Sequence, residues 1–151
     1  MTKRFTVDAS VFVASCRRHE AECAASCEFL RLVRQKDAVL IEPTVLPVEI
    51  AAAMSRGQED AARTVEYAVG VMALPHLSLH VLDGNSARRA MKIAVQCRLR
   101  GADALYVAAA EQYGARLVTL DAEQLERAPV SVRACRPDEA AAALRSVHDV
   151  A

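Results

Sequence analysis

Short runs of apolar residues alternate along the chain with longer segments in which apolar residues recur every three or four positions. Four of the short runs end directly at an acid, namely at Asp8, Glu42, Asp83 and Asp121. Short apolar runs are typical of buried strands, and the longer period is typical of amphipathic helices. We predict strands over residues 4–7, 38–41, 77–82, 116–120 and 130–132, of which the last has the weakest pattern.

Capping residues place the helices between these strands. Asp8 or Ser10 can cap a first helix, and Pro47 falls where a first helical turn tolerates proline. We expect the remaining helices over residues 19–36, 44–57, 58–73, 85–98, 103–113 and 137–147. Strands that alternate with helices form a parallel sheet covered on both faces, so the predicted class is α/β in a single domain, residues 1–151.

Composition excludes several classes of function. Lys and Arg number 19, as do Asp and Glu, so any contact with nucleic acid must come from a local patch. Aromatic residues are only 4%, which argues against a base-stacking platform. The chain has no apolar run of about 20 residues, so we expect no membrane partner. Five cysteines without a C-x-x-C pair suggest a cytoplasmic protein.

Four acids are predicted to meet at one edge of the sheet. Asp8 and Asp121 follow the first and fourth strands, Asp103 begins the helix that leads to the fourth strand, and Glu49 lies on the helix after the second. In an open parallel sheet, sites form outside the carboxyl ends of the strands. No Lys or Arg is adjacent in sequence to Asp8, Glu49 or Asp103.

Clustered carboxylates repel one another unless they take up protons or a cation. Oxygen ligands suit Mg²⁺ or Mn²⁺, and such an ion can activate water toward a phosphodiester. The four histidines show no metal-ligand spacing. Each acid alone also fits a helix cap, a turn or a solvated position, so the argument depends on the set.

The sequence resembles the PIN domain family, and within it the small VapC-type toxins of type II toxin–antitoxin systems. Four segments carry the resemblance: V-D-A-S-V-F-V at 7–13, L-P-V-E-I-A-A-A at 46–53, G-A-D-A-L-Y-V-A-A-A at 101–110 and R-L-V-T-L-D at 116–121. The resemblance implies a three-layer α/β/α sandwich around a parallel sheet of about five short strands. It also implies a divalent-metal-dependent ribonuclease.

The matching positions assign roles to individual residues. By resemblance, Asp8, Glu49, Asp103 and Asp121 are catalytic and bind Mg²⁺ or Mn²⁺, while Ser10 and Thr119 orient the carboxylates. Glu123 is the nearest match to a further acid or Asn that many members have. The family also implies an RNA substrate, a cognate antitoxin and a homodimer. The basic residues we expect near the RNA are Arg17, Arg18, Arg56, Lys92, Arg98 and Arg100.

There are four other interpretations, of which the first two stay open and the last two are weaker. The chain could be a PIN-like module that binds RNA or protein, or an RNA-processing PIN nuclease without an antitoxin. A phosphotransfer receiver needs an acidic pair near the first strand and a late Lys, which the sequence lacks. On a continuous helix Cys16, His19, Cys23 and Cys27 could bind zinc, but we interpret the cysteines as small buried apolar residues.

Overall fold

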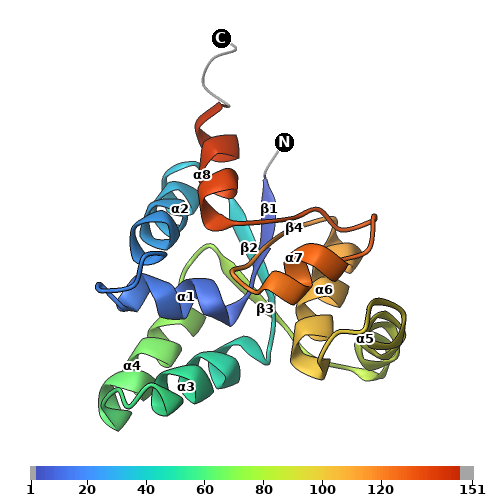
Figure 1. The fold of residues 1–151 in the computed structure, drawn as a ribbon, viewed down its shortest axis with the longest axis horizontal. Coiled ribbons are helices and arrows are strands. Elements are labelled where there is room, and N and C mark those ends of the chain that lie inside the picture. The colour runs from blue at the N-terminus through green and yellow to red at the C-terminus, as the bar shows by residue number, and fades with distance from the viewer. Residues whose placement is uncertain (1–2, 147–151) are drawn as a thin grey trace.

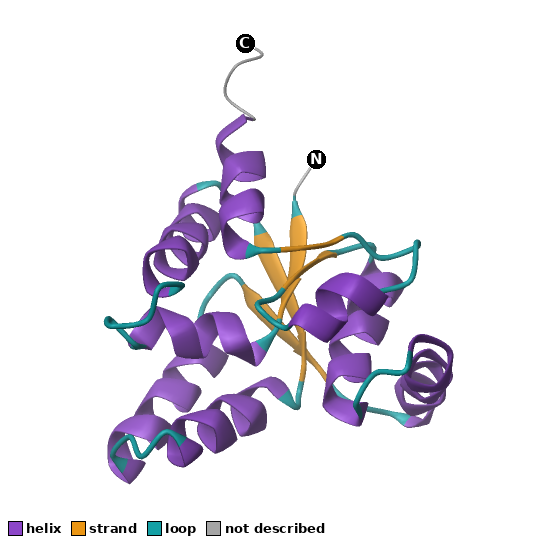
Figure 2. Cartoon of the chain, viewed as in Figure 1, coloured by secondary structure: helices purple, strands orange, loops and turns teal. Residues whose placement is uncertain are grey.

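The sheet is parallel throughout and five strands wide. The structure, a computed structural model, describes residues 3–146. The strand order is β3-β2-β1-β4-β5, and every neighbouring pair is parallel. The strands span β1 Arg4–Val7, β2 Val39–Pro43, β3 Leu77–His80, β4 Arg116–Val118 and β5 Ala134–Cys135. They run side by side through the middle of the molecule (Figure 2).

Helices cover both faces of the sheet. Their bounds are α1 Ala9–Cys16, α2 Cys23–Gln35, α3 Leu46–Arg56, α4 Ala61–Met72, α5 Gly84–Cys97, α6 Gly101–Tyr113, α7 Ala122–Arg127 and α8 Pro137–Arg145. Figure 1 shows α1 to α4 and α8 on one side of the strands, and α5 to α7 on the other. Right-handed crossovers require this, because the chain moves from β1 outward to β3 and then returns to β4 and β5. The α/β/α sandwich is therefore as predicted.

The core lies on both faces of the central strands. Val7, Leu40 and Leu117 are fully buried, and the rings of Phe5 and Phe29 meet edge to face at 5.3 Å, which anchors α2 to β1. On the other face, α6 buries a run of small side chains that includes Ala104, Ala108 and Ala110. Because these side chains are short, α6 lies directly against β1, β2 and β4. Its N-terminus is thereby held at the carboxyl edge of the sheet.

The prediction was wrong for the last strand. Residues 130–132 form a turn in which the Val132 amide donates to the Pro129 carbonyl at 2.8 Å, and Val130 is fully exposed. The fifth strand is Ala134–Cys135, whose two residues are too short to show a periodic pattern. The six-residue helix α7 was also missed, because a segment of this length has less than two turns of apolar period.

Two further boundaries differ from the prediction. The helix expected over residues 19–36 begins only at Cys23, because residues 17–22 turn after α1 with the Glu20 amide bonded to the Arg17 carbonyl. The third strand ends at His80, and Val81 and Leu82 are exposed. Val147, where the closing helix was expected to end, lies outside the described residues. No helix in the described part of the chain is long and apolar enough to span a bilayer.

Candidate metal centre at the carboxyl edge of the sheet

All four predicted acids lie at the N-terminal end of a helix. Asp8 and Asp121 are the N-caps of α1 and α7, and Glu49 and Asp103 lie in the first turns of α3 and α6. We call this group the acidic edge. β1 and β4 are neighbours at the point where the strand order reverses, which is where open α/β sheets form their sites. The positive ends of the helix dipoles partly offset the repulsion among the four carboxylates.

Asp8 is buried and tied to its own helix. Its Oδ2 accepts a hydrogen bond from the Ser10 amide at 3.0 Å, and only 7% of the residue is exposed. Burial raises the pKa of Asp8 above its usual value, although the hydrogen bonds with Ser10 lower it in part. The charges of Asp121 and Glu49 raise it further, which places those carboxylates within electrostatic reach.

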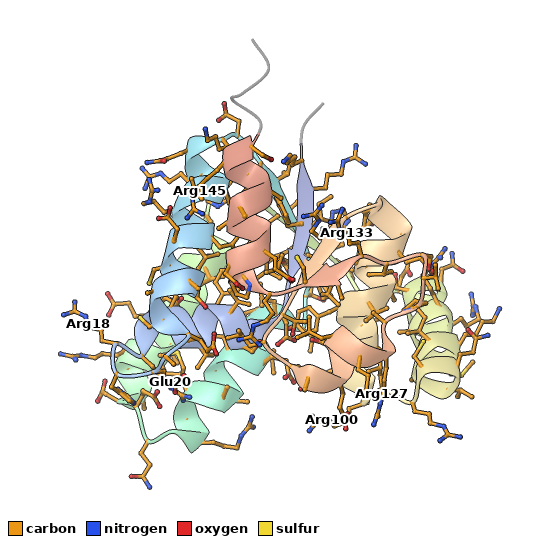
Figure 3. All side chains as sticks on the ribbon, turned by 45° about the horizontal axis from the view of Figure 1, so that its top comes forward. Arg18, Glu20, Arg100, Arg127, Arg133 and Arg145 are labelled. Carbon is orange, nitrogen blue, oxygen red and sulfur yellow. The ribbon has the colours of Figure 1, made fainter. Side chains whose placement is uncertain are left out.

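Asp103 is the least satisfied member of the acidic edge. Burial and the charges of Asp121 and Asp8 raise its pKa to about 6, and Arg100 opposes this only in part. The Oδ2 atom of Asp103 is buried and accepts no hydrogen bond from any described residue. Arg100 Nε lies 3.4 Å from this oxygen, without hydrogen-bond alignment, and Arg100 Nη2 lies 3.5 Å from Asp121 Oδ2. The exposed guanidinium of Arg100, which is labelled in Figure 3, thus lies beside both carboxylates by these distances.

Hydrogen bonds to Ser10 and Thr119 hold the segment that carries Asp121. The Ser10 hydroxyl accepts from the Leu120 amide at 3.2 Å, and Thr119 Oγ1 accepts from the Asp121 amide at 3.0 Å. Thr119 also donates to Gln124 Oε1 at 2.6 Å. Both predicted orienting residues therefore contact the backbone that positions Asp121. Their role in catalysis stays a prediction.

The fully buried Gln124 connects two members of the acidic edge, and sequence reasoning missed it. The backbone amide of Gln124 donates to Asp121 Oδ1 at 2.9 Å, and its side-chain Nε2 donates to the Asp103 carbonyl at 3.3 Å. The position three residues after an N-cap acid was its only local signal. Glu123 instead forms an ion pair with Arg127 at 3.6 Å, one turn further along α7.

Glu42 is a second missed residue, buried where β1 and β2 separate. Beyond Phe5, side chains bridge the two strands: Thr6 Oγ1 donates to the Ile41 carbonyl at 2.8 Å, and the Val7 amide donates to Glu42 Oε1 at 2.7 Å. Burial raises the pKa of Glu42 well above its usual value, and the charge of Asp8 adds to this. Burial therefore favours the neutral form of Glu42, whose Oε1 holds the backbone immediately before Asp8.

The acidic edge fits a hard divalent cation by its donor chemistry. All its side-chain donors are carboxylate oxygens, which Mg²⁺ and Mn²⁺ prefer, and the buried Oδ2 of Asp103 lacks a hydrogen-bond donor. A cation would also offset the mutual repulsion that raises the pKa of Asp8 and Asp103. Within residues 3–146, no three acids, cysteines or histidines already have the spacing of a metal cage.

Of the six basic residues predicted near the RNA, only Arg100 contacts the acidic edge. Arg17 instead ties the turn after α1 to Glu59 at 2.7 Å and to Glu20 at 3.3 Å. The Arg98 carbonyl accepts a hydrogen bond from Arg127 at the end of α5. The others are exposed on α5, α3 or the turn after α1: Lys92, Arg56 and Arg18.

The cysteine cluster does not support the zinc alternative. α1 and α2 are separate helices, so the four residues do not share one helical face. Cys23 Sγ and Cys27 Sγ lie 3.9 Å apart, and both thiols face the Ser15 carbonyl. Cys16 and Cys27 are exposed, so the interpretation of the cysteines as small buried apolar residues was wrong for these two. Cys135 is buried, as expected of a core residue.

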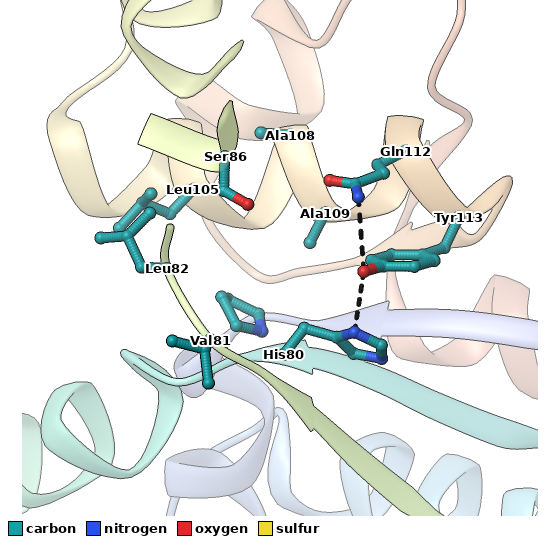
Figure 4. A pocket seen from close by; sticks show the side chains of 10 residues that line it. His80, Val81, Leu82, Ser86, Leu105, Ala108, Ala109, Gln112 and Tyr113 are labelled. Atoms are coloured by element: carbon teal, nitrogen blue, oxygen red, sulfur yellow. Dashed lines mark hydrogen bonds between the residues drawn. The ribbon is translucent and has the colours of Figure 1, made fainter. Parts of the chain in front are cut away.

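A small pocket lies between the end of β3 and α6, away from the acidic edge. Its volume of about 30 Å³ has room for a water molecule rather than a substrate. Figure 4 shows His80 Nδ1 beside the Tyr113 hydroxyl, at 2.7 Å, and Ser78 Oγ lies 3.1 Å from His80 Nε2. The His80–Tyr113 bond fastens the edge strand β3 to α6, and the Ser78 hydroxyl holds the His80 ring within β3.

Comparison with known proteins places this fold and these acids in one family. The family model described as the PIN domain matches residues 5–130, more than half of the chain. The chain belongs to the PIN domain family. The match spans all four members of the acidic edge, β1 to β4 and the helices between them. A search of curated proteins returned no relative.

Solved structures show the same fold at low sequence identity. PAE2754 from Pyrobaculum aerophilum is 23% identical, with a TM-score of 0.69 over 97% of this PIN chain and 98% of that one. VapC20 of Mycobacterium tuberculosis, described as a toxin that cleaves the sarcin-ricin loop, is 17% identical, with a TM-score of 0.69 over 85% and 98%. DNA-bound VapBC from Salmonella typhimurium is 15% identical, with a TM-score of 0.65 over 91% and 99%.

The neutral state of Glu42 predicts an unusual pH dependence of stability. The raised pKa of Glu42 means that the folded protein keeps this proton to a higher pH than the unfolded chain does. The contribution of Glu42 to stability therefore falls as the pH rises from the unfolded-state pKa to the folded-state pKa. Glu42→Gln removes this loss, so over that interval its free energy of unfolding should gain on the wild type by up to about 1.4 kcal/mol per pH unit.

Urea unfolding between pH 5 and pH 8 measures this difference. Glu126→Gln, at an exposed position of α7, is the control and should follow the wild type. If the profiles of Glu42→Gln and the wild type run parallel, Glu42 is ionised in the folded protein.

The position of Arg100 predicts that it competes with a cation. Its guanidinium lies beside Asp103 and Asp121 and is 74% exposed, so it can move away without breaking the core. Arg100→Gln should therefore raise the affinity for Mn²⁺ by about two- to fivefold, the range expected of an exposed ion pair. Isothermal titration of the protein with Mn²⁺, without RNA, measures this affinity. Arg127→Gln on the adjacent α7 is the control. Unchanged or weaker Mn²⁺ binding by Arg100→Gln would contradict the competition.

Proposed function

We propose that this PIN domain is a divalent-metal-dependent ribonuclease that hydrolyses RNA phosphodiester bonds. The observation that carries the proposal is the acidic edge itself: four acids on four helix N-termini, with a buried oxygen of Asp103 that accepts no hydrogen bond. Membership of the PIN domain family supports nuclease chemistry at this position.

In the proposed mechanism Asp8, Asp103 and Asp121 hold one or two ions of Mg²⁺ or Mn²⁺, and Glu49 completes the donor set. When bound, the ion supplies the Lewis acidity that makes a phosphodiester susceptible to water. Ser10, Thr119 and Gln124 keep the backbone of Asp121 in place, and Glu42 keeps the backbone before Asp8 in place. Arg100, which lies beside Asp103 and Asp121 and is exposed, would be able to contact an RNA phosphate if a cation took its place at these carboxylates.

A toxin role with a protein partner is the finer part of the proposal. The related structures include a toxin, VapC20, and VapBC complexes, which supports a cognate antitoxin for this chain. A second copy of this chain would need a separate surface, and exposed apolar side chains on the packed helices α3 and α4 provide one: Val48, Val65, Val69 and Met72. The free cysteines fit a reducing compartment such as the cytoplasm.

Asp8→Asn should abolish metal-dependent cleavage while leaving the fold intact. Asn caps a helix about as well as Asp, and the substitution removes a buried charge, so stability should not fall. The measurement is cleavage of a structured RNA by purified protein with Mg²⁺, with Mn²⁺ and with EDTA. The wild type should cleave only with metal, and the rate of the variant should fall by a factor of about 100 or more.

Asp138→Asn, at an exposed position of α8, serves as the control and should cleave like the wild type. Equal cleavage by Asp8→Asn and the wild type would assign the activity to a contaminant. A folded wild type that binds Mn²⁺ and RNA but cleaves no RNA would favour the binding-module alternative.

We also expect a homodimer, with the apolar side chains on α3 and α4 in the interface. Light scattering during size-exclusion chromatography should give about twice the 16.3 kDa mass of the chain. A double variant that carries both Val65→Glu and Val69→Glu should be monomeric, because the interface would otherwise bury two charges without partners. A dimer that survives this pair, or a monomeric wild type, would remove these helices from the interface.

A further inference from the structure

A basic groove lies at the edge of the sheet opposite to the acidic edge. Its volume is about 850 Å³, and four cationic side chains line it: Lys3, Arg4, Arg116 and Arg133. They come from the start of β1, the start of β4 and the residue before β5. Among residues 3–146, no acidic side chain lines the groove. Figure 3 shows Arg133 and Arg100 toward opposite ends of the strands.

Two of the four cations have a partner in the fold. Lys3 donates to the Ala143 carbonyl near the end of α8, and Arg4 donates to the Tyr113 carbonyl at the end of α6, at 3.2 Å. Both bonds satisfy helix C-termini. Arg116 and Arg133 form no ion pair with any residue between 3 and 146. Arg133 is exposed and Arg116 is half-buried beside Cys135, so among the described residues neither guanidinium has an anionic partner.

The sheet register keeps the like charges together. Leu117 pairs with Ala134, so Arg116 and Arg133 precede neighbouring residues on adjacent strands, which lie about 4.8 Å apart. The pKa of Lys3 is lowered by burial and by the charge of Arg116, which shows that the cations repel one another. An anion in the groove would relieve this repulsion, and guanidinium groups match the oxygens of a phosphate.

We propose that the basic groove binds the phosphate backbone of the substrate RNA, apart from the site of cleavage. This inference rests on the proposed ribonuclease function. The groove suits a sugar-phosphate backbone because its other lining is small, including Gly114 and Ala115, and Phe5 is only 2% exposed. It therefore offers neither an aromatic platform for bases nor a deep apolar hole for a protein side chain.

The separation of the groove from the acidic edge sets the kind of RNA. The four residues of β1 span about 13 Å, so an RNA that reaches both edges must extend along a side of the sheet. A short oligonucleotide at the acidic edge cannot reach Arg116 or Arg133. The groove thus selects a longer or folded RNA, such as a stem-loop.

The test compares two double variants. The groove pair carries both Arg116→Gln and Arg133→Gln. The charge-matched control pair carries both Arg31→Gln and Arg88→Gln, at exposed positions of α2 and α5. Both pairs are made in the Asp8→Asn protein, so that binding is measured without cleavage. Fluorescence anisotropy of a labelled stem-loop RNA should show about tenfold weaker binding for the groove pair. The slope of log affinity against log salt should fall by about 1.4, or about 0.7 for each lost phosphate contact.

Arg133→Gln alone, at an exposed position, gives a smaller loss in the same direction and covers the case in which the pair unfolds. Stem-loop affinity and salt slope unchanged in both groove variants would overturn the proposal, whether or not the wild type cleaves RNA. A labelled oligo-glutamate peptide that binds the wild type and not the groove pair, with RNA binding unchanged, would also overturn it and reassign the groove to an acidic protein segment.

Discussion

Repulsion among carboxylates held at one edge of a parallel sheet is the constraint that shapes this PIN domain. The charges of Asp121 and Glu49 raise the pKa of both Asp8 and Asp103, and burial of these two acids reduces the screening by water. The fold tolerates them because four helices begin where they lie. The remaining cost is visible in the raised pKa of Asp103 and in the Arg100 guanidinium beside it. A site of this kind gains stability when a cation enters, so binding and folding are linked.

The residues around the acids contact the nearby backbone and one carboxylate oxygen each of Asp8 and Asp121. Ser10, Thr119 and Gln124 hold the chain from Leu120 to Asp121, and Glu42 holds the Val7 amide. This arrangement leaves carboxylate oxygens for a ligand while fixing the direction of each side chain. Supporting residues of this type commonly determine how well an active site is preorganised.

The sequence allowed the sheet, most helices and the four acids to be predicted, because each has a local signal. Asp8 and Asp121 follow apolar runs directly, and Gly114 marks a helix end with a positive φ. Glu42 could not be found in this way, since its burial depends on the separation of β1 from β2. The basic groove was also missed, because Arg4, Arg116 and Arg133 are brought together only by strand pairing. The predicted basic residues were chosen by sequence, and of these only Arg100 lies at the acids.

The formal net charge of zero conceals a strong polarity of the molecule. The four acids of the acidic edge lie where the strands end, and four cations line the basic groove where the strands begin, so these two groups form a local dipole along the strand direction. In the field of a polyanion such a dipole experiences a torque that turns the cationic end forward. A protein that shows no net attraction to nucleic acid at long range would therefore still approach it in a preferred orientation, with the repelling end facing away until close contact.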